Sequence, residues 1–176
     1  MLFHKRTRID AIWRDSLRFH GRACANLALG VRVCDTALSH LELEAADAGR
    51  LVCVSETDGC CVDAIQVGLH CTVGKRHLLF YKTGKLIFTV YDLVGGGSLR
   101  MVTHQALADR IHAMKPEEVL AMPEEALFAF EEARPMTPRV WERVTKACDA
   151  PGEQIPPRES GVQDWPDVFR KFDQQK

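Results

Sequence analysis

Phe19-His20-Gly21-Arg22-Ala23-Cys24 is the stretch around which the fold is organised, because it places a histidine and a cysteine four residues apart directly before a helical pattern. In that pattern, apolar residues recur in alternating steps of four and three: Leu27, Val31, Cys34, Leu38 and Leu41. The spacing predicts a helix from about Cys24 to Leu41 that buries one face, and Gly30 within it indicates the close approach of another element. Cys24 would open this helix, where unpaired N–H groups and the helix dipole favour a thiolate.

A second sulfur-rich block runs from Glu56 to Lys75 and holds Cys60, Cys61 and Cys71. It contains apolar residues at helical spacing, which predict a short helix that begins at Cys60 or Cys61. We expect the two blocks to meet in space and to form one thiol and imidazole site. The spacing leaves the alternative of several buried, reduced cysteines open, since the chain has no Cys-x-x-Cys pair.

The rest of the chain predicts a single α+β domain, with helices packed on an antiparallel-rich or mixed sheet and a helical C-terminal extension. An amphipathic helix over Met1–Leu17 would pack on the core or form a dimer contact, and Leu51–Ser55 reads as a buried strand. Further segments are expected in this order: a hairpin of strands 77–81 and 86–93, a third strand at 99–102, and short helices starting near 104, 116, 123 and 140. We place the core domain at 1–133 and the extension at 134–176.

The composition sets limits on the function. The chain has 176 residues with 46% hydrophobic and 27% charged residues and a net charge of -1, which is typical of a globular protein. We expect neither nucleic acid nor membrane as a partner, because there is no basic field and no apolar run near the ~20 residues that span a bilayer. Seven cysteines without an export signal predict reduced thiols and a cytoplasmic location.

Four residues of the two blocks are candidate metal ligands: His20, Cys24, Cys60 and Cys71. Thiolate and imidazole together suit zinc or iron better than magnesium or calcium. Asp63, one turn after Cys60, could orient a ligating histidine, carry a proton in catalysis, or simply favour the helix start.

Three basic residues are candidates for binding a small anion: Arg22, Lys75 and Lys85. Lys75 belongs to Cys71-Thr72-Val73-Gly74-Lys75-Arg76, which is not a phosphate loop, because Leu69 and Arg76 stand where that motif needs glycine and serine or threonine.

Taken together, the two blocks resemble the FmdE family, which is similar to an accessory component of formylmethanofuran dehydrogenase. Residues 19–25 match the family segment Phe-His-Gly-His-x-Cys-Pro, and residues 27–32 match the Leu-Ala-x-Gly-x-Arg that follows it. In the second block, residues 60–66 match the segment Cys-x-x-Asp-Ala-Ile-Gln, and residues 71–75 match Cys-Thr-x-Gly-Lys. The resemblance implies His20, Cys24, Cys60 and Cys71 as ligands, with Asp63 and Gln66 supporting them, although Cys61 lies next to the matched Cys60. It also implies a homodimer and a place in a larger oxidoreductase complex.

The chain departs from this family at Arg22, where the family has a second histidine, and it lacks the C-terminal zinc ribbon of many relatives. Three functions stay open. The first is a metal-binding protein with an accessory or cofactor-handling role. The second is a thiol- or metal-dependent enzyme, with Cys60 and Asp63 as catalytic residues, that acts on a small anionic substrate. The third is a structural homo-oligomer whose cysteines belong to the core.

Overall fold

The computed structural model describes residues 2–148, and its centre is a five-stranded mixed sheet in the order β2-β1-β3-β4-β5. The strands are β1 (Leu51–Ser55), β2 (Leu78–Phe80), β3 (Ile87–Asp92), β4 (Ser98–Thr103) and β5 (Phe128–Glu131). All neighbours pair antiparallel except β1 and β2, which are parallel. The expected α+β class with a mixed, antiparallel-rich sheet is confirmed.

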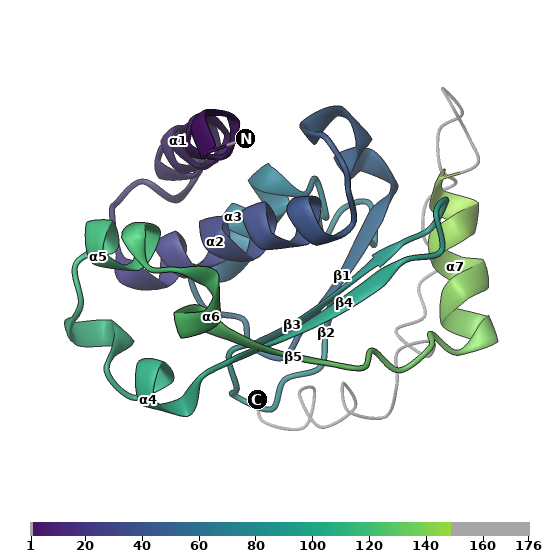
Figure 1. The fold of residues 1–176 in the computed structure, drawn as a ribbon. Coiled ribbons are helices and arrows are strands. Elements are labelled where there is room, and N and C mark those ends of the chain that lie inside the picture. Colours follow the sequence, from purple (N-terminus) through teal and green to yellow (C-terminus); the bar gives the residue numbers. More distant parts are fainter. Residues whose placement is uncertain (1, 149–176) are drawn as a thin grey trace.

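Helices α1 (Leu2–His20), α2 (Ala25–His40) and α3 (Cys61–Gly68) form a layer on one face of this sheet (Figure 1). Shorter helical segments follow: η1 (Ala45–Arg50), α4 (Gln105–Ala108), η2 (Ile111–Ala113), α5 (Pro116–Ala121) and α6 (Glu124–Leu127). Helix α7 (Pro138–Cys148) lies at the end of the sheet opposite to α4 and α5 (Figure 1). The predicted extension beyond Cys148 lies outside the described residues.

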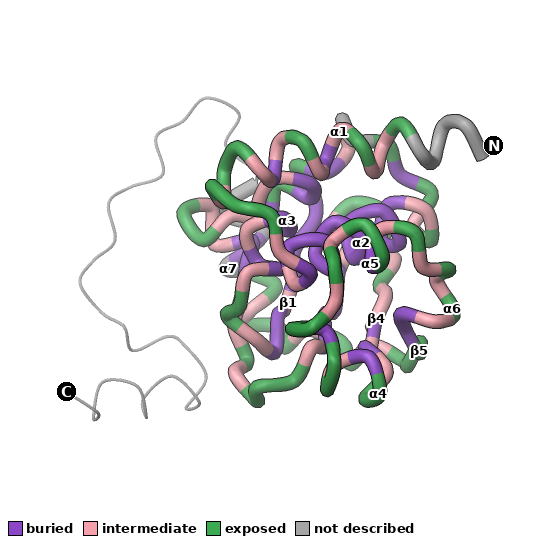
Figure 2. The backbone as a smooth tube through the Cα atoms, turned by 90° about the vertical axis from the view of Figure 1, so that its left-hand side faces the viewer, coloured by how far each residue is buried: buried purple, intermediate pink, exposed green. Residues whose placement is uncertain are grey.

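Helix α2 is the core element of the fold, with thirteen of its sixteen residues buried (Figure 2). The prediction of one buried face was too narrow, because α1, α3 and α5 pack on α2 in addition to the sheet. Its polar residues are therefore paired inside the protein. Asp35 accepts a 2.8 Å hydrogen bond from Arg8 Nε, and Arg32 donates to backbone carbonyls of the α5 segment.

The predicted hairpin of strands 77–81 and 86–93 is wrong, because β1 lies between β2 and β3. The turn between them crosses the end of β1, where the N–H groups of Thr83 and Gly84 donate to the carbonyl of Glu56. A short, largely apolar strand such as Leu51–Ser55 needs hydrogen-bond partners on both edges when it is buried, and this topology supplies them. The composition of the turn is a local signal, so it could not indicate that β2 pairs in parallel with β1.

Strand β5 was also missed, since the residues after Pro123 were expected to continue as a helix. Helix α6 ends at Leu127, and Phe128 immediately starts the pairing with β4, opposite Thr103.

The apolar face of α1 packs on its own chain, with Ile12 buried and Ile9, Trp13 and Leu17 against the core. The expected packing role of this face is confirmed. No helix within residues 2–148 has the length and apolar character to cross a bilayer.

Candidate metal centre

Three helix ends meet at one place and bring the two sulfur-rich blocks together. Helix α1 ends at His20, and Gly21 turns the chain with φ +83, a conformation that favours glycine. Cys24 is the N-cap of α2, and Cys60 is the N-cap of α3. The expectation that cysteines open both helices is confirmed.

The meeting of α2 and α3 depends on Gly30. A Cβ on this residue would lie 2.3 Å from the carbonyl oxygen of Cys61 and 2.8 Å from its Cα. Glycine is therefore the residue that lets the start of α3 lie directly against α2, as the sequence suggested.

His20, Cys24 and Cys60 form a group in which the potential ligand atoms all lie within 4.8 Å of one another. Cys24 Sγ is 3.8 Å from His20 Nε2. A tetrahedral zinc ion with a thiolate at ~2.3 Å and an imidazole at ~2.0 Å holds these atoms roughly 3.5 Å apart. His20 and Cys24 are thus already close to the spacing that a shared metal ion requires, and Cys60 Sγ lies within 4.8 Å of both ligand atoms.

Asp63 fixes the orientation of His20. Its Oδ2 lies 2.6 Å from His20 Nδ1, and the side chains of Asp63 and His20 are 32% and 12% exposed, respectively. When Nδ1 carries the proton and donates to this carboxylate, Nε2 is left unprotonated and faces Cys24. A carboxylate on the far nitrogen is the usual support for a metal-ligating histidine.

Opposing effects act on the pKa of the Cys24 thiol. Burial raises its pKa above the ordinary thiol value, the N–H of Leu27 at 3.4 Å lowers it, and the nearby Cys60 raises it further. The net pKa is raised, so the thiolate expected at this helix start is wrong for the metal-free protein, in which Cys24 stays protonated: burial outweighs the N–H of Leu27. A metal ion would displace that proton, since the thiolate is the ligating form.

The other cysteines with described side chains are buried thiols of the core: Cys34, Cys53, Cys61 and Cys71. Cys71 donates from its Sγ to the carbonyl of Leu51 at 3.2 Å and is not part of the three-residue group. Of the adjacent pair, Cys60 belongs to the group, whereas Cys61 is fully buried with a pKa raised by burial to about 12. The six cysteines with described side chains thus divide into two at the site and four in the core.

Comparison with known proteins adds the family. Residues 19–145 match the family described as "FmdE, Molybdenum formylmethanofuran dehydrogenase operon". The chain belongs to the FmdE family. Its match starts at Phe19, and so includes both blocks that form the three-residue group.

Among curated proteins, this FmdE chain is similar to the "Probable S-adenosyl-L-methionine-binding protein" of Archaeoglobus fulgidus, with 34% identity over 76 residues. The aligned part is 41% of this chain and 21% of that protein. The chain therefore spans about a fifth of the length of this relative.

The three basic candidates of the chain lie in different places. Arg22 is close enough to Cys24 to lower the pKa of its thiol. Lys85 lines a pocket together with Cys61. Lys75 lies on the turn 73–76, which Gln66 fixes by accepting a 3.3 Å hydrogen bond from Val73 N–H near the C-terminal end of α3. The structure does not bring Lys75 to the three-residue group.

The same pocket is lined by polar residues that the sequence did not single out, among them Asn26, Asp109 and His112. Asp109 and His112 lie more than 80 positions after Cys24, in a region read only as helix. No spacing rule links such distant residues, so only the fold could reveal them.

We expect Asp63→Asn to weaken zinc binding roughly 10- to 100-fold, because His20 would lose its carboxylate partner and its preferred tautomer. The measurement is a competition titration with a chromophoric chelator. Asp58→Asn is the matched control, since Asp58 pairs with Lys82 and lies outside the group. Equal zinc affinities for the two variants would contradict the orienting role of Asp63.

The buried thiols of Cys34 and Cys53 are expected to make the stability of the protein depend on pH in the alkaline range. Burial raises the pKa of both well above 9.0, so the folded state keeps protons that the unfolded state releases. Stability is therefore full below pH ~9 and falls as the pH rises toward the folded-state values, by up to about 1.4 kcal/mol per pH unit for each thiol. Urea denaturation at pH ~8 to ~10.5, with chelator and reductant, should show a shallower fall for Cys34→Ala than for the unchanged chain. Parallel curves would contradict this assignment.

Proposed function

We propose that this chain is a metal-binding FmdE protein whose centre is formed by His20 Nε2, Cys24 Sγ and Cys60 Sγ around a zinc or iron ion. The observation that carries the proposal is the convergence of these three atoms from three helix ends, within 4.8 Å of one another. The donor set of two thiolates and one imidazole suits a soft or borderline divalent ion.

The ligand set proposed here differs from the one expected from the sequence in one residue. Cys71 is left out, because its buried thiol donates to Leu51 within the core. The start of α3 supplies Cys60, and Asp63 on the same helix supports His20 from outside the ligand set. The start of α3 thus supplies both a ligand and the carboxylate that orients His20.

Three protein ligands are one fewer than a structural zinc site normally uses, and an open fourth position is typical of catalytic zinc. This favours a metal-dependent enzyme as the second candidate beside an accessory or cofactor-handling role. A metal ion bound there would supply Lewis acidity or a bound water of lowered pKa. The chain's own contribution would be to hold His20 by Asp63 and to keep both thiols at helix starts.

A thiol enzyme that uses Cys24 as its nucleophile without a metal ion is less well supported. The pKa of Cys24 is raised by burial, whereas a nucleophilic cysteine needs a lowered pKa. A purely structural role for all cysteines accounts for the four buried thiols but not for the partly exposed Cys24 and Cys60.

The family description names a dehydrogenase operon, and the A. fulgidus relative is named for S-adenosyl-L-methionine binding. A larger oxidoreductase complex, a homodimer and a cytoplasmic location are part of this proposal.

Metal content tests the proposal. Protein prepared without air and without chelators should contain about one zinc or iron ion per chain by mass spectrometry. Treatment with a strong chelator should remove the ion and lower the melting temperature, since an ion bound only by the folded state stabilises it. Protein that contains no metal and takes up none on titration with zinc or ferrous ion would contradict the proposed function.

A further inference from the structure

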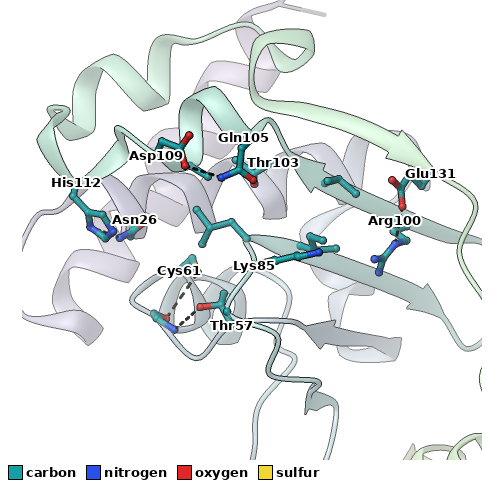
Figure 3. A pocket seen from close by; sticks show the side chains of 16 residues that line it. Asn26, Thr57, Cys61, Lys85, Arg100, Thr103, Gln105, Asp109, His112 and Glu131 are labelled. Carbon is teal, nitrogen blue, oxygen red and sulfur yellow. Dashed lines mark hydrogen bonds and ion pairs between the residues drawn. The ribbon is translucent and has the colours of Figure 1, made fainter.

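A pocket of about 620 Å³ opens at the end of the sheet where α2, α3 and the loop before β3 come together (Figure 3), and sequence neighbours of two proposed ligands line it. Gly59 and Cys61 line it, and they flank Cys60 in sequence. Asn26 lines it as well, two residues after Cys24. The volume is within the range of small-molecule sites in proteins.

Of the four formal charges around this pocket, Arg100 and Glu131 form an ion pair with each other. Arg100 Nε lies 3.2 Å from Glu131 Oε2, and its Nη2 lies 2.8 Å from Glu56 Oε1. Arg100 is therefore held by two carboxylates of its own chain, and its Nη1 also donates to Thr89 Oγ1 at 3.1 Å. It would not decide the charge of a ligand.

The remaining two charges have no ionic partner among the described residues. Lys85 is exposed, and its ammonium group makes no ion pair within residues 2–148. Asp109 accepts a 2.6 Å hydrogen bond from the neutral amide of Gln105, and no cation within the described chain pairs with it. In Figure 3, Asp109 and Gln105 lie on one side of the pocket, and Lys85 and Cys61 on the other.

Asn26 adds an acceptor to this arrangement. Its Nδ2 lies 3.4 Å from His112 Nδ1, whereas its Oδ1 is buried and has no hydrogen-bond partner in the described structure. A buried acceptor without a partner costs free energy, which a ligand N–H group would recover.

We infer that this pocket binds a small zwitterion, with its carboxylate directed to Lys85 and its ammonium group to Asp109 and the unpaired Asn26 Oδ1. The inference rests on the proposed function, because it makes this pocket the substrate site of the metal centre. The flexible stem of Lys85 allows its ammonium group to reach a bound anion.

Four thiols of matched shape test the inference on the cobalt-loaded protein, where a thiol bound to the ion changes the visible absorption. L-Homocysteine carries both charges, 4-mercaptobutyrate lacks the amine, 3-mercaptopropylamine lacks the carboxylate, and 1-propanethiol lacks both. Each thiol is titrated against the unchanged chain, Lys85→Met and Asp109→Asn. Lys75→Met and Asp10→Asn are matched controls, because neither residue lines the pocket.

Lys85→Met should raise the Kd of the two thiols that carry a carboxylate about tenfold. Asp109→Asn should raise the Kd of the two thiols that carry an amine by a similar factor. The Kd of 1-propanethiol should stay the same in both variants. Three results would overturn the inference while the cobalt spectrum still supports the metal centre: Kd values that do not change, Kd values that change equally for all four thiols, or a spectrum that none of the four thiols alters. A protein that takes up no cobalt would instead contradict the proposed function itself, and this inference with it.

Discussion

Cys24→Ser and Cys60→Ser are each expected to weaken zinc binding by more than about a hundredfold. Loss of a residue that hydrogen-bonds to a metal ligand already lowers metal affinity roughly 10- to 100-fold, and each serine variant removes a ligand itself. The fold should be retained, since both residues are only partly buried N-caps and serine is a favoured N-cap residue. Zinc affinity is measured by chelator competition, and the fold by circular dichroism.

Cys71→Ser is the matched control for these two variants. Serine at this position can still donate to the carbonyl of Leu51, as the thiol does at 3.2 Å. This variant should keep the zinc affinity of the unchanged chain, with some loss of stability from the buried hydroxyl. Loss of zinc in a folded Cys71→Ser protein would restore the ligand set that the sequence alone suggested. Undiminished affinity in Cys24→Ser or Cys60→Ser would exclude that residue as a ligand.

Gly30→Ala is expected to lower the free energy of unfolding by about 2–4 kcal/mol, at the upper end of overpacking effects. The added methyl group would lie 2.3 Å from the Cys61 carbonyl oxygen and 2.9 Å from the Ala64 Cβ. Backbone atoms of α3 cannot give way like a side chain, so α3 must move away from α2. Because Cys24 is the N-cap of α2 and Cys60 the N-cap of α3, zinc affinity should fall together with stability.

Gly49→Ala is the control for the loss of a glycine. A Cβ on Gly49 meets no atom within 4 Å, and a tolerated change from glycine to alanine typically stabilises by about 0.4–1 kcal/mol. Urea denaturation of the metal-free proteins separates the two variants. A Gly30→Ala protein as stable as Gly49→Ala, with full zinc affinity, would contradict the close contact of α2 with α3.

The sequence was informative where the relevant physics is local. The spacing from Leu27 to Leu41 located α2, and Cys24 and Cys60 were placed at helix starts because the helical patterns begin there. Gly30 inside the helical pattern indicated a close approach of another element, and the start of α3 is that element. The order of the two sulfur blocks indicated the family, which the match over residues 19–145 shows.

Prediction from the sequence failed where segments far apart in the chain determine the pairing and the packing. Lys82-Thr83-Gly84-Lys85 has the composition of a hairpin turn, but β1 pairs with both flanking strands and separates them. Cys71 has the same local chemistry as Cys60, and only the packing directs its sulfur to Leu51 in the core. Phe128 starts a strand because β4 offers it an open edge, and this pairing partner lies far away in the sequence.

X-ray absorption spectroscopy at the metal edge of the zinc-loaded protein tests the central claim most directly. The account predicts about two sulfur ligands at ~2.3 Å and at least one imidazole nitrogen at ~2.0–2.1 Å, with the remaining position taken by a light atom. A shell of three or four sulfurs, or one without sulfur, would contradict a centre formed by His20, Cys24 and Cys60.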